Sequence, residues 1–141
     1  MRPFKLDPKL QQDCFVLGKL GQNQLLLMNN SLAPWFILVP EVDKAVTELY
    51  QLELETQQNL LEEINKLSKF VAKQGETEKL NVAAIGNVVS QLHIHVVGRN
   101  RNDFCWPNVI WGTEQKESYS EHAVQELSER LKLELQLQPI E

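Results

Sequence analysis

The segment QLHIHVVGR, residues 91–99, constrains the fold more than any other part of the chain. Successive side chains of a β-strand point to opposite faces of the sheet. One face of this segment is entirely apolar, with Leu92, Ile94 and Val96. The other face carries a polar row, Gln91, His93 and His95, which is followed by Val97 and Arg99. We therefore expect a sheet with one buried face and, at this strand, a short polar row on the opposite face.

Four other segments have strand character. They are residues 14–20, 24–30, 35–40 and 79–86. The first two are apolar runs separated by Gly-Gln-Asn, a pattern typical of a β-hairpin. The third, WFILVP, indicates a short buried strand that ends at Pro40, because proline cannot donate a backbone hydrogen bond within a sheet.

Helical spacing is clearest between residues 53 and 74, where leucine, isoleucine and valine recur at three- and four-residue steps. This pattern predicts the longest helix, with Gly75 as its stop. Weaker patterns predict a turn or short helix at 6–13, a short helix at 42–49 and a helix at about 118–130. Beyond it, leucines alternate from Leu131 to Leu137. That alternation predicts an extended tail packed on another surface, such as a second subunit.

Strands grouped before a long helix, then two more strands and a helix, indicate an α+β fold. We expect a single domain over residues 1–141, a length that suits one core. Its antiparallel sheet has about five strands, covered by one long helix and a C-terminal helix. Residues from about 113 to 141 form an extension of helix and tail.

Composition excludes several classes of function. The net charge of −5 argues against nucleic-acid and anionic-membrane binding, which depend on lysine and arginine. No apolar run reaches 18 residues, and the first 13 residues lack the apolar core of a signal peptide. Cys14 and Cys105 form neither a disulfide framework nor a metal-binding spacing. The sequence therefore predicts a cytoplasmic protein with reduced thiols.

The two histidines of the strand have three possible roles. They are solvated or hydrogen-bonded side chains without function, or metal ligands, or catalysts. A metal site needs a third ligand. His122 is the only other histidine, and Cys105 or Asp103 could serve, but their spacing does not indicate a metal site. Catalysis is the alternative because neutral imidazole attacks phosphorus readily and titrates near pH 7. Same-face residues lie roughly 6.5–7 Å apart along a strand, so both rings can line one small-molecule site.

The segment QLHIHVVGR also resembles the signature of the histidine triad (HIT) superfamily, His-φ-His-φ-His-φ-φ. Gln91 stands in place of the first histidine, whereas His93 and His95 match the second and third. The resemblance covers roughly residues 10–110. It includes LLLMNN, the proline-terminated WFILVP and the dipeptide Trp106-Pro107.

This resemblance implies a HIT-like fold and a nucleotide hydrolase or nucleotidyl transferase that acts at an α-phosphate. His93 is then the nucleophile that forms a covalent nucleotidyl-histidine, and His95 contacts the phosphate or the leaving-group oxygen. Gln91 keeps the hydrogen-bonding geometry but cannot change charge near pH 7. Phosphoramidates and dinucleoside polyphosphates are the implied substrates.

Further residues take roles by the same resemblance. Asn29 or Asn30 contacts the ribose, although both are also ordinary turn formers. Gly86 and Asn87 line the phosphates. Arg99, which continues the polar row, either helps to hold the phosphates or is only a solvated strand end. Val88 departs from the family pattern, which often has a serine or threonine there.

The implied partners are a small-molecule nucleotide and a second copy of the chain, with no nucleic acid and no membrane. No cofactor is required, although a divalent cation can accompany the nucleotide. Two alternatives stay open. One is a nucleotide-binding module with little turnover, and the other is a His-x-His metal-binding protein.

Overall fold

A computed structural model describes residues 3–140. Five strands form one antiparallel sheet in the order β1-β2-β3-β5-β4. The strands are β1 (Cys14–Leu20), β2 (Asn23–Met28), β3 (Trp35–Pro40), β4 (Lys79–Ala83) and β5 (Ile94–Arg99). This α+β architecture, its antiparallel sheet and the β1–β2 hairpin confirm the fold predicted from the sequence.

The helices are α1 (Pro8–Asp13), the 3₁₀ turn η1 (Leu49–Gln51), α2 (Leu54–Ala72) and α3 (Glu121–Leu135). Asp7 begins α1 by accepting the Lys9 backbone N–H at 2.8 Å, and Ser120 begins α3 by accepting that of Ala123 at 3.1 Å. The long helix α2 agrees with its prediction. None of the helices within residues 3–140 has the length and apolar character that crossing a membrane requires.

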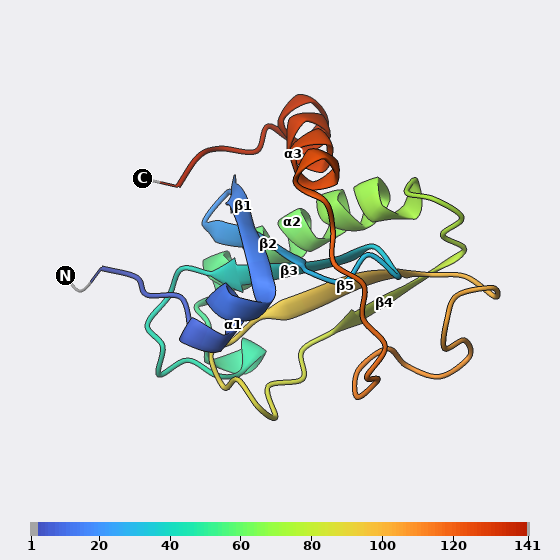
Figure 1. Ribbon diagram of the computed structural model, residues 1–141. Coiled ribbons are helices and arrows are strands. Elements are labelled where there is room, and N and C mark those ends of the chain that lie inside the picture. Colours follow the sequence, from blue (N-terminus) through green and yellow to red (C-terminus); the bar gives the residue numbers. More distant parts are fainter. Residues whose placement is uncertain (1–2, 141) are drawn as a thin grey trace.

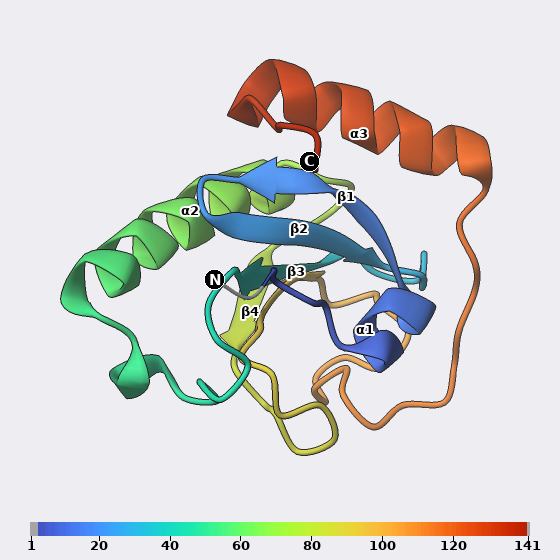
Figure 2. The same ribbon diagram turned by 90° about the vertical axis from the view of Figure 1, so that its left-hand side faces the viewer.

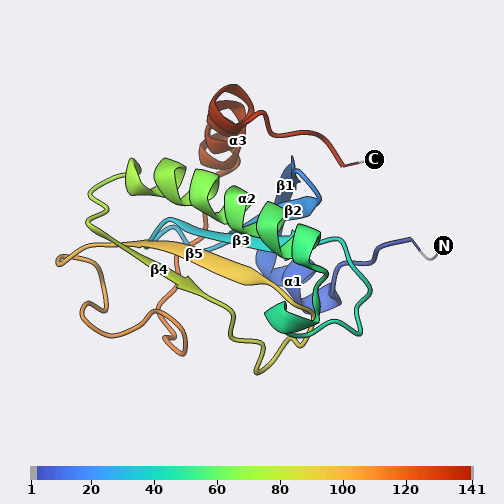
Figure 3. The ribbon, with the colours of Figure 1, turned by 180° about the vertical axis from the view of Figure 1, so that it is seen from behind.

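The longer helices α2 and α3 cover one face of the sheet, and the short helix α1 with irregular segments covers the other. Apolar residues of α2 and α3 pack on Leu25, Phe36 and Val96. On the opposite face, α1, the N-terminal segment and the chain after β5 lie against the sheet (Figure 1; Figure 3 shows the reverse view). The prediction of only one buried face was therefore wrong. Segments far from β5 in the sequence bury the histidine face.

The C-terminal region differs from its prediction. The leucines expected in an extended tail continue α3 to Leu135, because Leu127, Leu131 and Leu135 follow a helical spacing. The helix ends at Gln136, whose φ is 54°. The next residues turn back to β1 of the same chain (Figure 2), where Gln138 and Lys19 exchange two backbone hydrogen bonds of 2.7 and 3.0 Å.

Gly18 lies so close to the C-terminal segment that any Cβ there would collide with the carbonyl oxygen of Gln138.

The predicted helix at 42–49 is absent. Asp43 instead forms a turn by accepting the Ala45 N–H at 2.9 Å, and only the 3₁₀ turn at Leu49–Gln51 follows.

Candidate active site

His93 and His95 lie side by side on the face of the sheet opposite α2. His95 is in the interior of the sheet, opposite Ile37 of β3 and Ala83 of β4, and His93 immediately precedes β5. The ring centroids are 4.9 Å apart, and the residues are 6% and 5% exposed. The structure thus brings the two imidazoles together, as the strand period predicts, within an apolar surrounding.

The proton position on His93 follows from one contact. Its Nδ1 lies 2.7 Å from the backbone carbonyl oxygen of Gln91. A carbonyl oxygen only accepts, so Nδ1 carries the proton and donates it. In the neutral ring the lone pair is then on Nε2. That atom has no hydrogen-bond partner among the described residues, and it keeps some solvent-accessible surface.

His95 has the opposite tautomer. The indole Nε1–H of Trp35 donates to His95 Nδ1 at 3.0 Å, in a buried contact. Tryptophan is a donor only, so Nδ1 accepts and the proton of the neutral ring is on Nε2. Burial, with a smaller contribution from the charge of His93, lowers the pKa of His95 to about 3. His95 is therefore a neutral hydrogen-bond donor throughout the physiological pH range.

Trp111 packs edge-on against the same group. Its ring centroid is 5.3 Å from that of His95 and 6.3 Å from that of Trp35. Its Nε1 is buried and has no hydrogen-bond partner among the described residues. The two indoles thus surround one imidazole, but only Trp35 makes a hydrogen bond to it.

The side chain of Gln91 points away from this chemistry. Its Oε1 accepts the Asp7 backbone N–H at 2.8 Å, and its Nε2 donates to the Lys5 carbonyl oxygen at 2.9 Å. Gln91 therefore holds the N-terminal segment with its amide and His93 with its backbone carbonyl. The resemblance implies a part in the hydrogen-bond network of the histidines, and only the backbone of Gln91 takes that part.

Comparison with known proteins places this geometry in a family. A family model described as the HIT domain matches residues 9–102. The chain belongs to the HIT family. Solved HIT structures match 94–96% of the chain, whereas curated protein sequences give no match.

Three of these crystal structures are histidine triad proteins. The one from Sinorhizobium meliloti 1021 is 36% identical, has a TM-score of 0.88, and covers 94% of this chain and 97% of its own. The one from Marinobacter aquaeolei VT8 is 37% identical, with a TM-score of 0.89 and coverage of 96% and 98%. The one from Bradyrhizobium japonicum is 30% identical, with a TM-score of 0.89 and coverage of 95% and 99%.

The two asparagines expected at the ribose of a HIT substrate follow β2. Asn30 is buried; its Oδ1 accepts the backbone N–H groups of Leu32 and Glu117, and its Nδ2 donates to the Gln115 carbonyl oxygen. Asn29 accepts the Tyr119 N–H at 2.9 Å and is half-buried. Both asparagines fasten the segment before α3 to the sheet, and both the oxygen and the nitrogen of the Asn30 amide have partners there.

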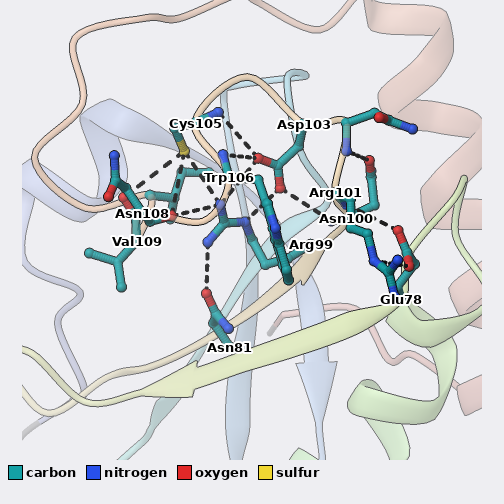
Figure 4. Close-up of polar contacts among 12 residues, drawn as sticks. Glu78, Asn81, Arg99, Asn100, Arg101, Asp103, Cys105, Trp106, Asn108 and Val109 are labelled. Atoms are coloured by element: carbon teal, nitrogen blue, oxygen red, sulfur yellow. Dashed lines mark hydrogen bonds and ion pairs between the residues drawn. The ribbon is translucent and has the colours of Figure 1, made fainter.

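Arg99 is 2% exposed and lies at the far end of the histidine row. Its Nε and Nη2 donate to both carboxylate oxygens of Asp103 at 2.8 and 3.1 Å, and Nη1 donates to Asn81 Oδ1 at 2.8 Å. Nη2 also contacts the carbonyl oxygen of Asn108 at 2.8 Å, as Figure 4 shows. These contacts hold the loop after β5. They argue for a structural role and against the predicted contact with phosphate.

The remaining predicted residues lie in the loop between β4 and β5. Gly86 and Asn87 are exposed, and Gly86 has a φ of 71°, which favours glycine. Val88, at the position of the missing hydroxyl, is 81% exposed. Among residues 3–140, no group of three or more His, Cys, Asp or Glu comes together that could hold a metal ion.

Sequence reasoning missed Trp35 and the N-terminal segment as parts of this site. Trp35 has one sequence signal: it lies two residues before Ile37, so both side chains are on one face of β3. Only the register, which pairs Ile37 with His95, shows that this face is the histidine face.

Proposed function

We propose that the protein is a nucleotide hydrolase or nucleotidyl transferase that acts at an α-phosphate through a covalent nucleotidyl-histidine on His93. Membership of the HIT family supports a nucleotide ligand. The observation that carries the proposal is the hydrogen bond from His93 Nδ1 to the Gln91 carbonyl oxygen. It leaves a lone pair on the unpartnered Nε2, which is the requirement for a nucleophile.

The neighbouring imidazole complements this nucleophile. As His93 Nε2 attacks the α-phosphorus, negative charge develops on the phosphoryl oxygens, and the Nε2–H of His95 donates to one of them. The leaving group departs as the P–N bond to His93 forms. Water or another acceptor then attacks phosphorus, the P–N bond breaks, and neutral His93 is regenerated. The Gln91 carbonyl stabilises the cationic ring of the intermediate.

Binding of the rest of the nucleotide falls to fewer residues than the resemblance implies. In our proposal, the exposed loop with Gly86 and Asn87 lines the phosphates, because it leads directly into Gln91 and the histidines. Asn29 is the ribose contact, since its amide nitrogen has no protein partner among residues 3–140, whereas both amide atoms of the buried Asn30 are hydrogen-bonded. Arg99 has no place at the substrate.

No resident cofactor is part of this proposal, and a divalent cation would arrive with the nucleotide phosphates. The His-x-His metal alternative loses support because Trp35 occupies Nδ1 of His95 and no carboxylate or thiol contacts either ring among the described residues. Activity that survives treatment with a chelator, in a protein without bound zinc, would favour the nucleotide enzyme over the metal-binding protein.

We further propose that the protein is a homodimer joined through β4. Among the described residues this strand has no partner on its outer side, whereas the opposite edge, β1, is bridged by the C-terminal segment. Val82 of β4 and Ile85 beyond it are 46% and 42% exposed. An unpaired edge next to exposed apolar side chains is suited to pairing with a second copy.

The test of function is turnover of a panel of nucleoside phosphoramidates and dinucleoside polyphosphates. His93→Ala should lower kcat at least about 1,000-fold while the protein remains folded. His122→Ala, a change at an exposed histidine, should keep wild-type turnover. Equal rates for wild type and His93→Ala would refute covalent catalysis. Nucleotide binding without turnover would favour a binding module.

A further inference from the structure

Trp35 and His95 form a donor–acceptor pair in which neither partner can exchange roles. The indole has one polar group, an N–H that cannot accept, and it donates to His95 Nδ1 at 3.0 Å. Both side chains are buried, so water does not compete for the bond. As long as this bond persists, His95 keeps its proton on Nε2 and presents an N–H towards the site.

No other group near the two imidazoles is placed to supply a proton. Among residues 3–140, neither ring contacts a carboxylate, a lysine or an arginine; their polar partners are the Trp35 indole and the Gln91 carbonyl. The Gln91 side chain is an amide, which does not titrate, and it is bonded to the backbone of Lys5 and Asp7. The Nδ1–H of His93 is donated to the Gln91 carbonyl oxygen.

We propose that Trp35 is a specificity-determining residue, which acts as a positioning residue for His95. Its indole N–H holds His95 in the Nε2–H tautomer, so that the site gives the substrate a hydrogen bond but gives the leaving group no proton. The enzyme therefore selects leaving groups that depart as stable anions. This inference rests on the function proposed above.

The chemistry of the two substrate classes differs at the leaving atom. In an anhydride, the bond from the α-phosphorus to the bridging oxygen breaks, its electron pair stays on oxygen, and a phosphate or nucleotide anion leaves without a proton. In a phosphoramidate, the electron pair stays on nitrogen, which leaves as an amine only if a proton arrives. Neutral imidazole N–H does not supply that proton near pH 7, and general acid catalysis is worth about 100- to 10,000-fold.

The experiment uses one nucleoside, two leaving groups and two tryptophan variants. Diadenosine triphosphate and adenosine 5′-phosphoramidate share the adenosine 5′-phosphoryl group. Trp35→Phe removes the donor and keeps an aromatic ring. Trp111→Phe is the matched control. It changes an indole that packs on the same imidazole, but the Nε1 of this indole has no hydrogen-bond partner among the described residues. The ring nitrogens of His95 are followed by ¹⁵N NMR, and kcat is measured for both substrates.

For the wild type we expect an unprotonated Nδ1, a protonated Nε2, and a kcat at least about 100-fold higher on the anhydride. Trp111→Phe should preserve the tautomer and this ratio. Trp35→Phe should give a mixture of tautomers and lower kcat on the anhydride about tenfold. Comparable rates on the two substrates, or unchanged His95 nitrogens in Trp35→Phe, would overturn the proposal.

Two further outcomes are also decisive. If Trp35→Phe does not fold, the wild-type nitrogen shifts and the ratio of its two rates decide the proposal without the variant. If neither substrate is turned over and His93 forms no adduct, the proposed function fails and leaving-group selection fails with it. Turnover with an adduct but without selection overturns only the role of Trp35.

Discussion

The guanidinium of Arg99 forms a bidentate ion pair with the carboxylate of Asp103, and both side chains are almost completely buried, at 2% and 3% exposure. Asp103 also accepts the backbone N–H groups of Asn100, Cys105 and Trp106. One carboxylate thus fastens the start of the loop after β5 to the sheet. Further along, this loop brings Trp111 against His95.

Removing this carboxylate should destabilise the protein strongly. Asp103→Ala leaves the Arg99 charge buried and unpaired, so we expect the free energy of unfolding to fall by about 3 kcal/mol or more. Urea denaturation measures this change. Arg101→Ala is the control, because it breaks an exposed ion pair with Glu78 and should cost less than about 1 kcal/mol. Similar losses in the two variants would contradict a structural role for the buried pair.

Acid should destabilise the protein through His95. Its pKa is about 3 in the folded state and 6.5 as the ordinary value, so the unfolded chain binds more protons between these pH values. The contribution of neutral His95 to the free energy of unfolding is therefore fully present above pH 6.5. It decreases as the pH falls towards 3, by about 2 kcal/mol between pH 6.5 and 5.

Urea unfolding at pH 7 and pH 5 isolates this contribution when the wild type is compared with His95→Asn, in which a non-titrating amide can still accept from Trp35. The variant should lose about 2 kcal/mol less than the wild type on acidification. His122→Asn, at an exposed histidine, is the control. Parallel losses in wild type and His95→Asn would show that His95 takes up protons without penalty in the folded protein.

The sequence allowed the fold and the pairing of His93 with His95 on one face to be predicted, because both depend on local patterns. The period of two at residues 91–99 placed His93 and His95 on one face, and the helical spacing at 53–74 identified α2. Contacts between distant segments could not be inferred in this way. Asp7 meets the side chain of Gln91 across 84 positions of sequence, and Trp35 meets His95 across 60.

The extended tail was wrongly predicted because one pattern of leucines fits two structures. Leucines at every second position from Leu131 also include the four-residue step to Leu135, and the helix begun at Ser120 continues through them. Arg99 was expected at a phosphate because it continues the polar row. Its guanidinium instead binds Asp103, which lies only four residues further along the chain.

The amide of Gln91 should hold the N-terminal segment in place. Gln91→Ala removes two hydrogen bonds, so the Asp7 amide should exchange faster and the free energy of unfolding should fall by about 1–3 kcal/mol. Gln91→Glu keeps the acceptor for Asp7 and should exchange at an intermediate rate. Hydrogen exchange followed by NMR or mass spectrometry measures this. Gln12→Ala, at an exposed position of α1, is the control. Unchanged protection at Asp7 in Gln91→Ala would show that the Gln91 amide does not hold the N-terminal segment.

Dimerisation through β4 should be sensitive to charge on that strand alone. Val82→Lys places a lysine at the proposed interface and should convert a dimer to a monomer in light scattering coupled to size-exclusion chromatography. Val16→Lys is the matched control, because Val16 is 39% exposed on β1, the opposite edge strand. A monomeric wild type, or loss of the dimer in the β1 variant only, would rule out pairing at β4.

The central claim is that His93 Nε2 becomes covalently bonded to a nucleotide. Mass spectrometry of the protein during turnover of a dinucleoside polyphosphate tests it directly, with quenching in alkaline denaturant because the P–N bond of a phosphohistidine is acid-labile. We expect an added nucleoside monophosphate on the peptide that contains His93, present in His122→Ala and absent in His93→Ala. Steady turnover with no adduct on that peptide, or an adduct on another residue, would contradict it.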